Sequence, residues 1–352
     1  MKGRYIHILL IAAALLMTAA CKKEHRPEED PASFIMLSAT EAGSNSHLKN
    51  GTFNPTPGTK ALLDADKFAT SGNRIQIYDF VTDGTTTTKH IDDQIGPELS
   101  SNSPMHSPGY TWPFVNGPHQ WCPGSHKFFG WLVKDANMTA SNSPTSFFGS
   151  GFAFENFLLT IPQVSFTKDT PQFDFMYSNI YTTEPINTPV PLEFSHLFSA
   201  FYITALNRDS ENAVRVKEIK LNNLNTSKSA QINFTGNTTA VTYIDSGVST
   251  SFSFTYAGEL LSTTAKTISD KYMIWPQTAD DFSDATLFIR YDYTSEGQTK
   301  EQERTIPLSS ITEWNAGVVN SINIVIDVDQ ITFYINSLED WNAEEKDIVV
   351  EM

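Results

Sequence analysis

Apolar and polar residues alternate along much of the chain, and this alternation predicts β-strands. The clearest example is residues 321–335, SINIVIDVDQITFYI, where isoleucine, valine or phenylalanine occupies every second position in two runs. Strict period-two alternation over such a length is typical of half-buried strands. Asp329 and Gln330 separate the two runs, as a tight hairpin connection would. Helical patterns of matching quality are absent from the sequence.

The same strand pattern recurs between segments rich in Asn, Gly, Ser, Thr and Pro, so we predict an all-β protein. Further strands are expected within residues 73–81, 190–206, 216–224 and 230–234. The best candidate for a domain boundary is residues 182–191, TTEPINTPVP, where three prolines interrupt the strand pattern. We therefore expect two domains, residues 61–185 and residues 186–352.

Residues 1–20 have the order of a secretory signal: a basic start, an apolar run, and small residues before Cys21. The apolar run is about a dozen residues long, too short for the roughly 20 that a membrane-spanning helix needs. Small residues ending in Cys resemble a bacterial lipobox, although Thr18 stands where Leu is usual. Cys21 would then carry acyl chains that anchor the protein stably. The alternative is an ordinary signal peptide that is cut nearby and leaves Cys21 unmodified.

Residues 21–60 are polar, charged and proline-containing, and we interpret them as a tether outside the lipid. Within the tether, Phe34–Ala39 (FIMLSA) is expected to form a first strand. Cys122 is the second of the two cysteines. If Cys21 is lipidated, no intramolecular disulfide can form, and Cys122 is predicted to be a lone buried thiol.

The charge of the chain excludes one class of partner. The formal net charge is −16, and losing Lys2 and Arg4 with the signal would make it −18. An acidic surface repels phosphates, so we exclude a nucleic-acid role.

Six segments, in order along the chain, carry a resemblance to a known family. They are GTKALLDADKFATSGNRIQIYDF, YTWPFVNGPHQWCPGSHKFFGWLV, IPQVSFTKDTPQFDFMYSN, VPLEFSHLFSAFYI, WPQ, and ITEWNAGVVNSINIVID with ITFYINSLEDW. Together they resemble the fimbrillin-like proteins, which are subunits of type V pili of anaerobic Gram-negative bacteria.

The resemblance implies two β-sandwich domains of transthyretin-like topology with Greek-key antiparallel sheets. It also implies export as an outer-membrane lipoprotein, followed by proteolytic removal of an N-terminal segment that includes the first strand, Phe34–Ala39. By match to the family's basic-Ala step, the cut would fall between Lys60 and Ala61. Lys60 stands where the family usually has Arg, and the alternative is an uncut lysine in an exposed linker.

A β-sandwich that lacks one strand exposes unpaired backbone groups and an apolar groove. A strand donated by a neighbouring subunit repairs both, and head-to-tail use of such a site gives an open filament. The chain offers one donor candidate near its end, Ile348, Val349 and Val350. The other interpretation is that these residues form the last strand of their own domain.

The sequence contains few candidates for site chemistry. His119, Cys122 and His126 are spaced like metal ligands, but a structural zinc site needs four, so no metal site is predicted. His196 lies in an apolar run and is expected to be a buried, hydrogen-bonded structural histidine. The scattered acidic residues cannot be paired into an acid–base couple from sequence, and Asp79, Asp174 and Asp340 are interpreted equally well as loop or strand-end residues.

The aromatic residues of YTWPFVNGPHQWCPG leave a second function open. Trp112 and Trp121 would be glycan contacts if they were exposed, although aromatic residues in β-sandwiches mostly lie in the core. The alternative function is therefore a monomeric, glycan-binding surface lipoprotein, and a weaker one is a hydrolase whose site the sequence does not reveal.

We expect a non-enzymatic structural and adhesive fimbrial subunit at the outer membrane and cell surface, with no cofactor. Its expected partners are other fimbrial subunits, the outer membrane through the lipid anchor, and host or bacterial surface ligands.

Overall fold

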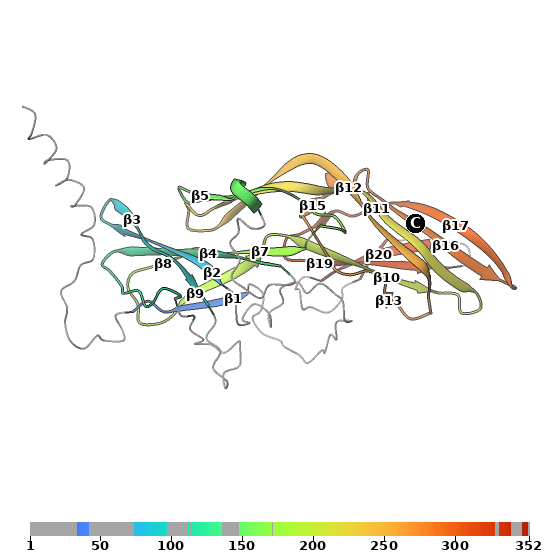
Figure 1. Cartoon of the computed structure of the whole chain (residues 1–352), viewed down its shortest axis with the longest axis horizontal. Helices are drawn as coiled ribbons and strands as arrows, with labels where there is room; N and C mark the ends of the chain where they lie inside the picture. Colours follow the sequence, from blue (N-terminus) through green and yellow to red (C-terminus); the bar gives the residue numbers. More distant parts are fainter. Residues whose placement is uncertain are drawn as a thin grey trace, which may run out of the picture.

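The computed structural model of the chain describes residues 34–41, 74–96, 112, 114–135, 148–170, 172–327, 331–338 and 347–350. These residues form an elongated β-structure of three large sheets and one two-stranded sheet (Figure 1). Within the described part of the chain, no helix is both long enough and apolar enough to cross a membrane.

The first sheet occupies the left half of Figure 1 and has the strand order β1-β9-β7-β4-β2-β3, with β8 paired to β4. Its strands are β1 (Leu37–Glu41), β2 (Ile75–Asp83), β3 (Thr86–Ile95), β4 (Ser125–Asp135), β7 (Phe173–Ser178), β8 (Tyr181–Thr183) and β9 (Val190–His196). All its pairings are antiparallel except that of β1 with β9, which is parallel.

The second sheet links the two halves of the molecule, because two strands of 21 residues each run along it. Its strands are β5 (Ala153–Glu155), β6 (Leu158–Ser165), β11 (Ala213–Asn233), β12 (Ala240–Leu260), β16 (Thr286–Ser295) and β17 (Gln298–Pro307). β11 pairs with β16 over its first part and with β6 over its last part. The β11–β12 hairpin therefore belongs to both halves.

The third sheet has the strand order β13-β10-β19-β20-β21, with β14 paired to β10. Its strands are β10 (Ser199–Asn207), β13 (Lys266–Thr267), β14 (Tyr272–Ile274), β19 (Val319–Ile326), β20 (Ile331–Leu338) and β21 (Asp347–Val350). The small sheet pairs β15 (Gln277–Thr278) with β18 (Glu313–Trp314). The short helices η2 (Gly149–Gly151) and α4 (Ala279–Phe282) complete the described elements.

The all-β prediction is confirmed, and the alternating stretch 321–335 covers most of β19 and β20, with Ile326 opposite Ile331. Two features of this region differ from the sequence pattern. β10 and β19 pair in parallel, which short local connections do not predict. Every residue of β19 is buried, including its polar positions, because both faces of this central strand are covered.

Two buried polar residues of β19, Asn320 and Asn323, are hydrogen-bonded to its neighbour β10. Asn320 Nδ2 donates to Ser199 Oγ at 3.0 Å, and the Thr204 hydroxyl donates to the side-chain oxygen of Asn323. Such pairing offsets the cost of burying polar groups. The alternation in β19 therefore reflects one face that packs against apolar residues and one whose buried polar groups are hydrogen-bonded, and neither face is exposed to solvent.

One large hydrophobic core runs through both halves of the molecule. It includes Phe129 and Phe175 of the first sheet, Ile219 of the second, and Ile322 of the third. The predicted division near residue 185 does not coincide with a division between sheets, because β9 lies after it and still belongs to the first sheet. The transthyretin-like layout of the two domains stays a prediction.

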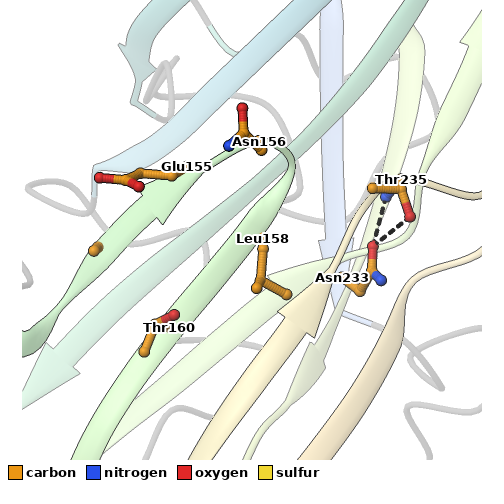
Figure 2. A pocket seen from close by; sticks show the side chains of 7 residues that line it. Glu155, Asn156, Leu158, Thr160, Asn233 and Thr235 are labelled. Carbon is orange, nitrogen blue, oxygen red and sulfur yellow. Dashed lines mark hydrogen bonds between the residues drawn. The ribbon is translucent and has the colours of Figure 1, made fainter.

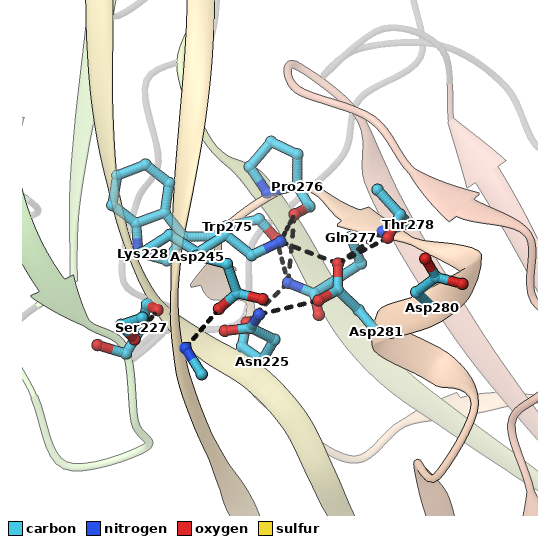
Figure 3. A network of polar contacts seen from close by, with 12 residues as sticks. Asn225, Ser227, Lys228, Asp245, Trp275, Pro276, Gln277, Thr278, Asp280 and Asp281 are labelled. Carbon is cyan, nitrogen blue, oxygen red and sulfur yellow. Dashed lines mark hydrogen bonds and ion pairs between the residues drawn. The ribbon is translucent and has the colours of Figure 1, made fainter.

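A buried polar network fixes α4 against β11 (Figure 3). Lys228 Nζ lies 2.9 Å from Asp281 Oδ2 and donates to the Pro276 carbonyl at 2.9 Å, and Asn225 Nδ2 donates to Asp281 Oδ1 at 2.9 Å. Burial acts to raise the pKa of Asp281, but hydrogen bonds from the Thr278 backbone, Lys228 and Asn225 outweigh it and lower that pKa. The carboxylate is thus held ionised in the interior.

Candidate functional site

The segment Phe34–Ala39 is part of the fold rather than only part of a tether. Ile35, Leu37 and Ala39 are buried, while the residues between them are half-buried. This alternation places every second side chain in a second, smaller core inside the first sheet. That core also contains Ile75, Ile77, Ile91, Ile95, Trp112, Phe128, Leu132, Met176, Val190, Leu192 and Phe194.

Backbone hydrogen bonds hold this segment on both flanks. On one flank, β1 pairs with β9 in parallel register over five residues. On the other flank, the Ile35 N–H donates to the His119 carbonyl at 2.8 Å, and the Trp112 N–H donates to the Leu37 carbonyl at 2.9 Å. Residues 34–37 are bonded to this second flank and residues 36–41 to β9, so the segment joins two neighbours and is not a free edge where they overlap.

The residues on the second flank, which we call the closing loop (residue 112 with 114–120), continue the hydrogen bonding to β3. The Val115 N–H donates to the Gln94 carbonyl at 2.8 Å, and Ile95 forms an antiparallel bridge with Phe114. Since β3 already pairs with β2, the sheet closes on itself through β1 and the closing loop. The smaller core is the interior of this closed sheet.

A buried carboxylate ties the closing loop to β3. Asp93 is 4% exposed; Asn116 Nδ2 donates to its Oδ1 at 2.6 Å, and His119 Nε2 lies 2.9 Å from its Oδ2. His119 is also the residue whose carbonyl receives the Ile35 N–H. Asp93 thus positions the loop that flanks the first strand.

A second polar group lies in the interior of the closed sheet. Asp79 Oδ2 is 2.6 Å from His126 Nδ1 and 2.8 Å from His90 Nδ1, and His126 Nε2 donates to the Cys122 carbonyl at 2.9 Å. Burial acts to lower the pKa of His126, but the hydrogen bonds to Asp79 and to the Cys122 carbonyl outweigh it and raise that pKa. The expectation that Asp79 lies at a strand end is wrong, since it is a buried mid-strand residue of β2.

The predicted metal-like spacing does not bring its residues together as one set. His119 binds Asp93, whereas His126 binds Asp79 and the Cys122 backbone. Cys122 is buried, as predicted. The sequence analysis did not identify Asp79 as the partner of His126. The sequence held one indication: Asp79 is an acidic residue at a position where the alternation of Ile75 and Ile77 predicts an apolar one.

The prediction for His196 as a buried structural histidine is confirmed. Its Nδ1 lies 2.7 Å from Asp174 Oδ2, and both side chains are buried. Asp174 is the second residue of β7 and so lies near the end of that strand, while Asp340 lies outside the described residues.

The glycan-contact candidates do not form an exposed aromatic platform, which corrects the expectation for Trp112. Its side chain is 2% exposed and belongs to the smaller core. Trp121 is half-buried, with its ring edge-on to His126 at 4.7 Å between centroids. Because Trp112 is buried, the two indoles cannot present a shared exposed surface to a sugar.

An open pocket lies instead at the turn between β5 and β6 and the end of β11 (Figure 2). Its lining residues are Ala153, Glu155, Asn156, Leu158, Thr160, Asn233 and Thr235. Asn233 Oδ1 accepts hydrogen bonds from the backbone and hydroxyl of Thr235 and is thereby turned toward its own chain. The lining mixes polar residues with Ala153 and Leu158, and it carries no aromatic ring for stacking on a sugar.

The C-terminal donor candidate forms β21, which pairs antiparallel with β20 at the edge of the third sheet, with Ile348 opposite Ile335. The lipidation candidate Cys21 and the processing candidates Lys60 and Ala61 lie outside the described residues.

These features define an all-β protein in which the N-terminal strand completes a closed sheet and the C-terminal strand ends an open one. The chain matches the fimbrillin-like family over residues 59–341, and it belongs to that family. The matched range begins after β1, so the first strand lies outside it.

The comparison with solved structures also found matches. A candidate cell adhesion protein of Bacteroides uniformis is 15% identical, with 89% of this chain and 100% of that chain covered and a TM-score of 0.47. A fimbrial assembly protein of Parabacteroides distasonis is 14% identical, with 80% and 95% covered and a TM-score of 0.37. No curated protein matched the chain.

Proposed function

We propose that the chain is a structural, non-enzymatic subunit of a fimbrium that assembles by exchange of its first strand. Cutting between Lys60 and Ala61 would leave Phe34–Ala39 bound only non-covalently, because the cut separates β1 from β2. A strand from a neighbouring subunit then takes the place of β1 between β9 and the closing loop. Membership of the fimbrillin-like family supports this role.

The observation that supports the proposal most directly is the site that holds Phe34–Ala39 between β9 and the closing loop, which we call the seat of the first strand. Ile35 and Leu37 fill the interior, and both flanks of the segment are hydrogen-bonded. Each fully buried large aliphatic side chain contributes roughly 1.5–3 kcal/mol, so an empty seat is costly and a donor strand would be held firmly. Main-chain bonds would supply affinity, and every second side chain would supply specificity.

The end of the chain offers a donor with the matching spacing. Ile348 and Val350 recur at the two-residue interval that Ile35 and Leu37 use, with Val349 between them. β21 would have to leave β20 to act in this way. Leaving an edge position disrupts pairing on one flank.

The proposal places the precursor at the outer membrane through a lipid on Cys21. After the cut, the lipid and the residues up to Lys60 stay behind while the folded subunit joins other fimbrial subunits. Adhesion to host or bacterial surface ligands would then be a property of the filament. In the anchored precursor, the chain's own first strand occupies the acceptor site and so blocks premature polymerisation.

The test is controlled proteolysis of the purified precursor with an enzyme that cuts after lysine and arginine. We expect a new N-terminus at Ala61, followed by a ladder of high-mass species as the first strand is replaced. Lys60→Gln should abolish both, whereas Lys67→Gln, a matched change outside the proposed cut, should leave both intact. A mature N-terminus elsewhere would contradict the assignment of Lys60. Release of the first strand without any polymer would contradict strand exchange itself.

A further inference from the structure

Three side chains in the closed sheet, Asp79, His90 and His126, converge on one point. Their ligand-type atoms all lie within 4.8 Å of one another. The side chains of Asp79 and His126 are fully buried, while that of His90 is 18% exposed. Strand exchange makes no use of this cluster, so its burial needs its own explanation.

Each of the three residues comes from a different neighbouring strand. Asp79 lies on β2, between β3, which carries His90, and β4, which carries His126. His126 stands opposite Val81, two residues along β2 from Asp79, which puts both side chains on the interior face.

A β-bulge brings in the third residue. Asp79 pairs with Ile91 and Phe80 pairs with Lys89, so His90 is an extra residue on β3. Bulges re-aim side chains in this way, and here the bulge turns His90 toward the Asp79 carboxylate.

The hydrogen bonds of His126 limit what its second nitrogen can carry. The Cys122 carbonyl can only accept, so His126 Nε2 must bear a hydrogen. His126 Nδ1 faces a carboxylate oxygen at 2.6 Å. A hydrogen must lie between this nitrogen and the carboxyl oxygen, or a metal ion must replace it, because otherwise two bare lone pairs would face each other.

The carboxylate itself has an unused oxygen. Asp79 Oδ1 is buried and has no hydrogen-bond partner among the residues that the structure describes. An unsatisfied, buried carboxylate oxygen is costly, and such a group calls for an unseen partner.

We propose that Asp79, His90 and His126 bind one divalent transition metal ion of the Zn²⁺ type. Two imidazole nitrogens and one carboxylate oxygen are ligands that suit Zn²⁺, with a fourth position left for water. The hydrogen bond from His126 Nε2 to a backbone carbonyl is the support that metal-binding histidines usually have. Bonds of about 2.0–2.2 Å at tetrahedral angles separate ligand atoms by roughly 3.4 Å, so small rotations of the side chains would open the site.

The ion would stiffen the closed sheet next to the closing loop. It would join β2, β3 and β4 at one point, and His126 would connect it to the backbone of Cys122, two residues beyond the closing loop. This inference does not depend on proteolysis or on strand exchange, and it holds for the uncut precursor.

The test is titration of the purified, metal-stripped full-length protein with Zn²⁺, followed by calorimetry. We expect one equivalent to bind with a dissociation constant of about 1 µM or below. His90→Gln should weaken binding by about 100-fold or more. His119→Gln is the matched control, because this histidine also binds a buried carboxylate but is outside the set, and it should bind Zn²⁺ like the wild type.

A spectroscopic measurement on the wild type keeps the inference testable if the variants fail to fold. In NMR spectra of the histidine rings, the Nδ1 proton of His126 should be present without metal and lost at one equivalent of Zn²⁺. The inference is overturned if the wild type binds no Zn²⁺, Co²⁺ or Ni²⁺ stoichiometrically. It is equally overturned if His90→Gln binds as tightly as His119→Gln, or if His126 keeps both ring protons at saturating Zn²⁺.

Discussion

The first and last described strands are held in opposite ways. The segment 34–41, which contains β1, joins β9 to the closing loop and places Ile35, Leu37 and Ala39 in the interior of a closed sheet. β21 is the outermost strand of an open sheet and pairs with β20 over four residues. Removing β1 would open the closed sheet and uncover its core, whereas removing β21 would only shorten an edge.

This difference bears on how a subunit can exchange strands. A strand with two flanks and three buried side chains leaves behind a seat that another strand can fill with matching contacts. An edge strand leaves with less disruption, because its loss breaks pairing on one side only. The two terminal strands are therefore suited to different roles: β1 fills the acceptor site until it is removed, and β21 is the strand that is donated.

The largest expected effect comes from a charge placed in the seat of β1. Leu37→Asp should lower the free energy of unfolding by at least about 4 kcal/mol, because it combines a lost aliphatic side chain with an unpaired buried carboxylate. Ser38→Asp is the matched control on the half-buried face of the same segment and should cost about 1 kcal/mol or less. Urea unfolding measures both.

Should Leu37→Asp prevent folding altogether, Leu37→Ala replaces it with an expected cost of about 2–5 kcal/mol. Equal stability of the Leu37 and Ser38 variants would show that the segment is not seated in the core.

The C-terminal half has stabilising contacts of its own, among them the buried pair of Lys228 and Asp281. Unfolding at low pH measures how much this pair contributes. The pKa of Asp281 is lowered in the folded state, so its contribution is present above its unfolded value of about 3.9 and is lost as the pH falls below that value. Stability should therefore decline below about pH 4 with a slope of up to about 1.4 kcal/mol per pH unit from this group.

Urea titrations between pH 2.5 and 6 provide the measurement, with pH values chosen around that window. Asp281→Asn should remove this part of the slope. Asp280→Asn is the control, because its side chain is exposed and points away from Lys228 in Figure 3. Identical slopes for the two variants would mean that the Lys228–Asp281 pair does not stabilise the fold.

The sequence predicted local features of these regions well and long-range ones poorly. Alternation within residues 321–335 identified β19 and β20, because the two-residue repeat of a strand can be recognised from consecutive residues alone. The parallel pairings of β1 with β9 and of β10 with β19 join residues more than a hundred positions apart, and no local pattern encodes them.

The candidate site shows the same limit. Phe34–Ala39 could be predicted as a strand from its apolar residues, but its place between β9 and the closing loop depends on tertiary hydrogen bonds. Spacing grouped His126 with His119 and Cys122, whereas its partner Asp79 is 47 residues away and reaches it across a strand pair. Trp112 was a surface candidate by composition and became a core residue by the same closure of the sheet.

The smallest expected effect comes from deleting residues 347–352, which removes β21. The cost should be about 1 kcal/mol, because a short edge strand contributes few backbone hydrogen bonds and each contributes only about 0.5–1.5 kcal/mol net. Urea unfolding measures this cost, and the ladder of high-mass species after proteolysis reports assembly. A folded monomer that no longer forms the ladder would identify β21 as the donor, whereas a cost near that of Leu37→Asp would mean that both termini are integral to the monomer and that the contrast between them is false.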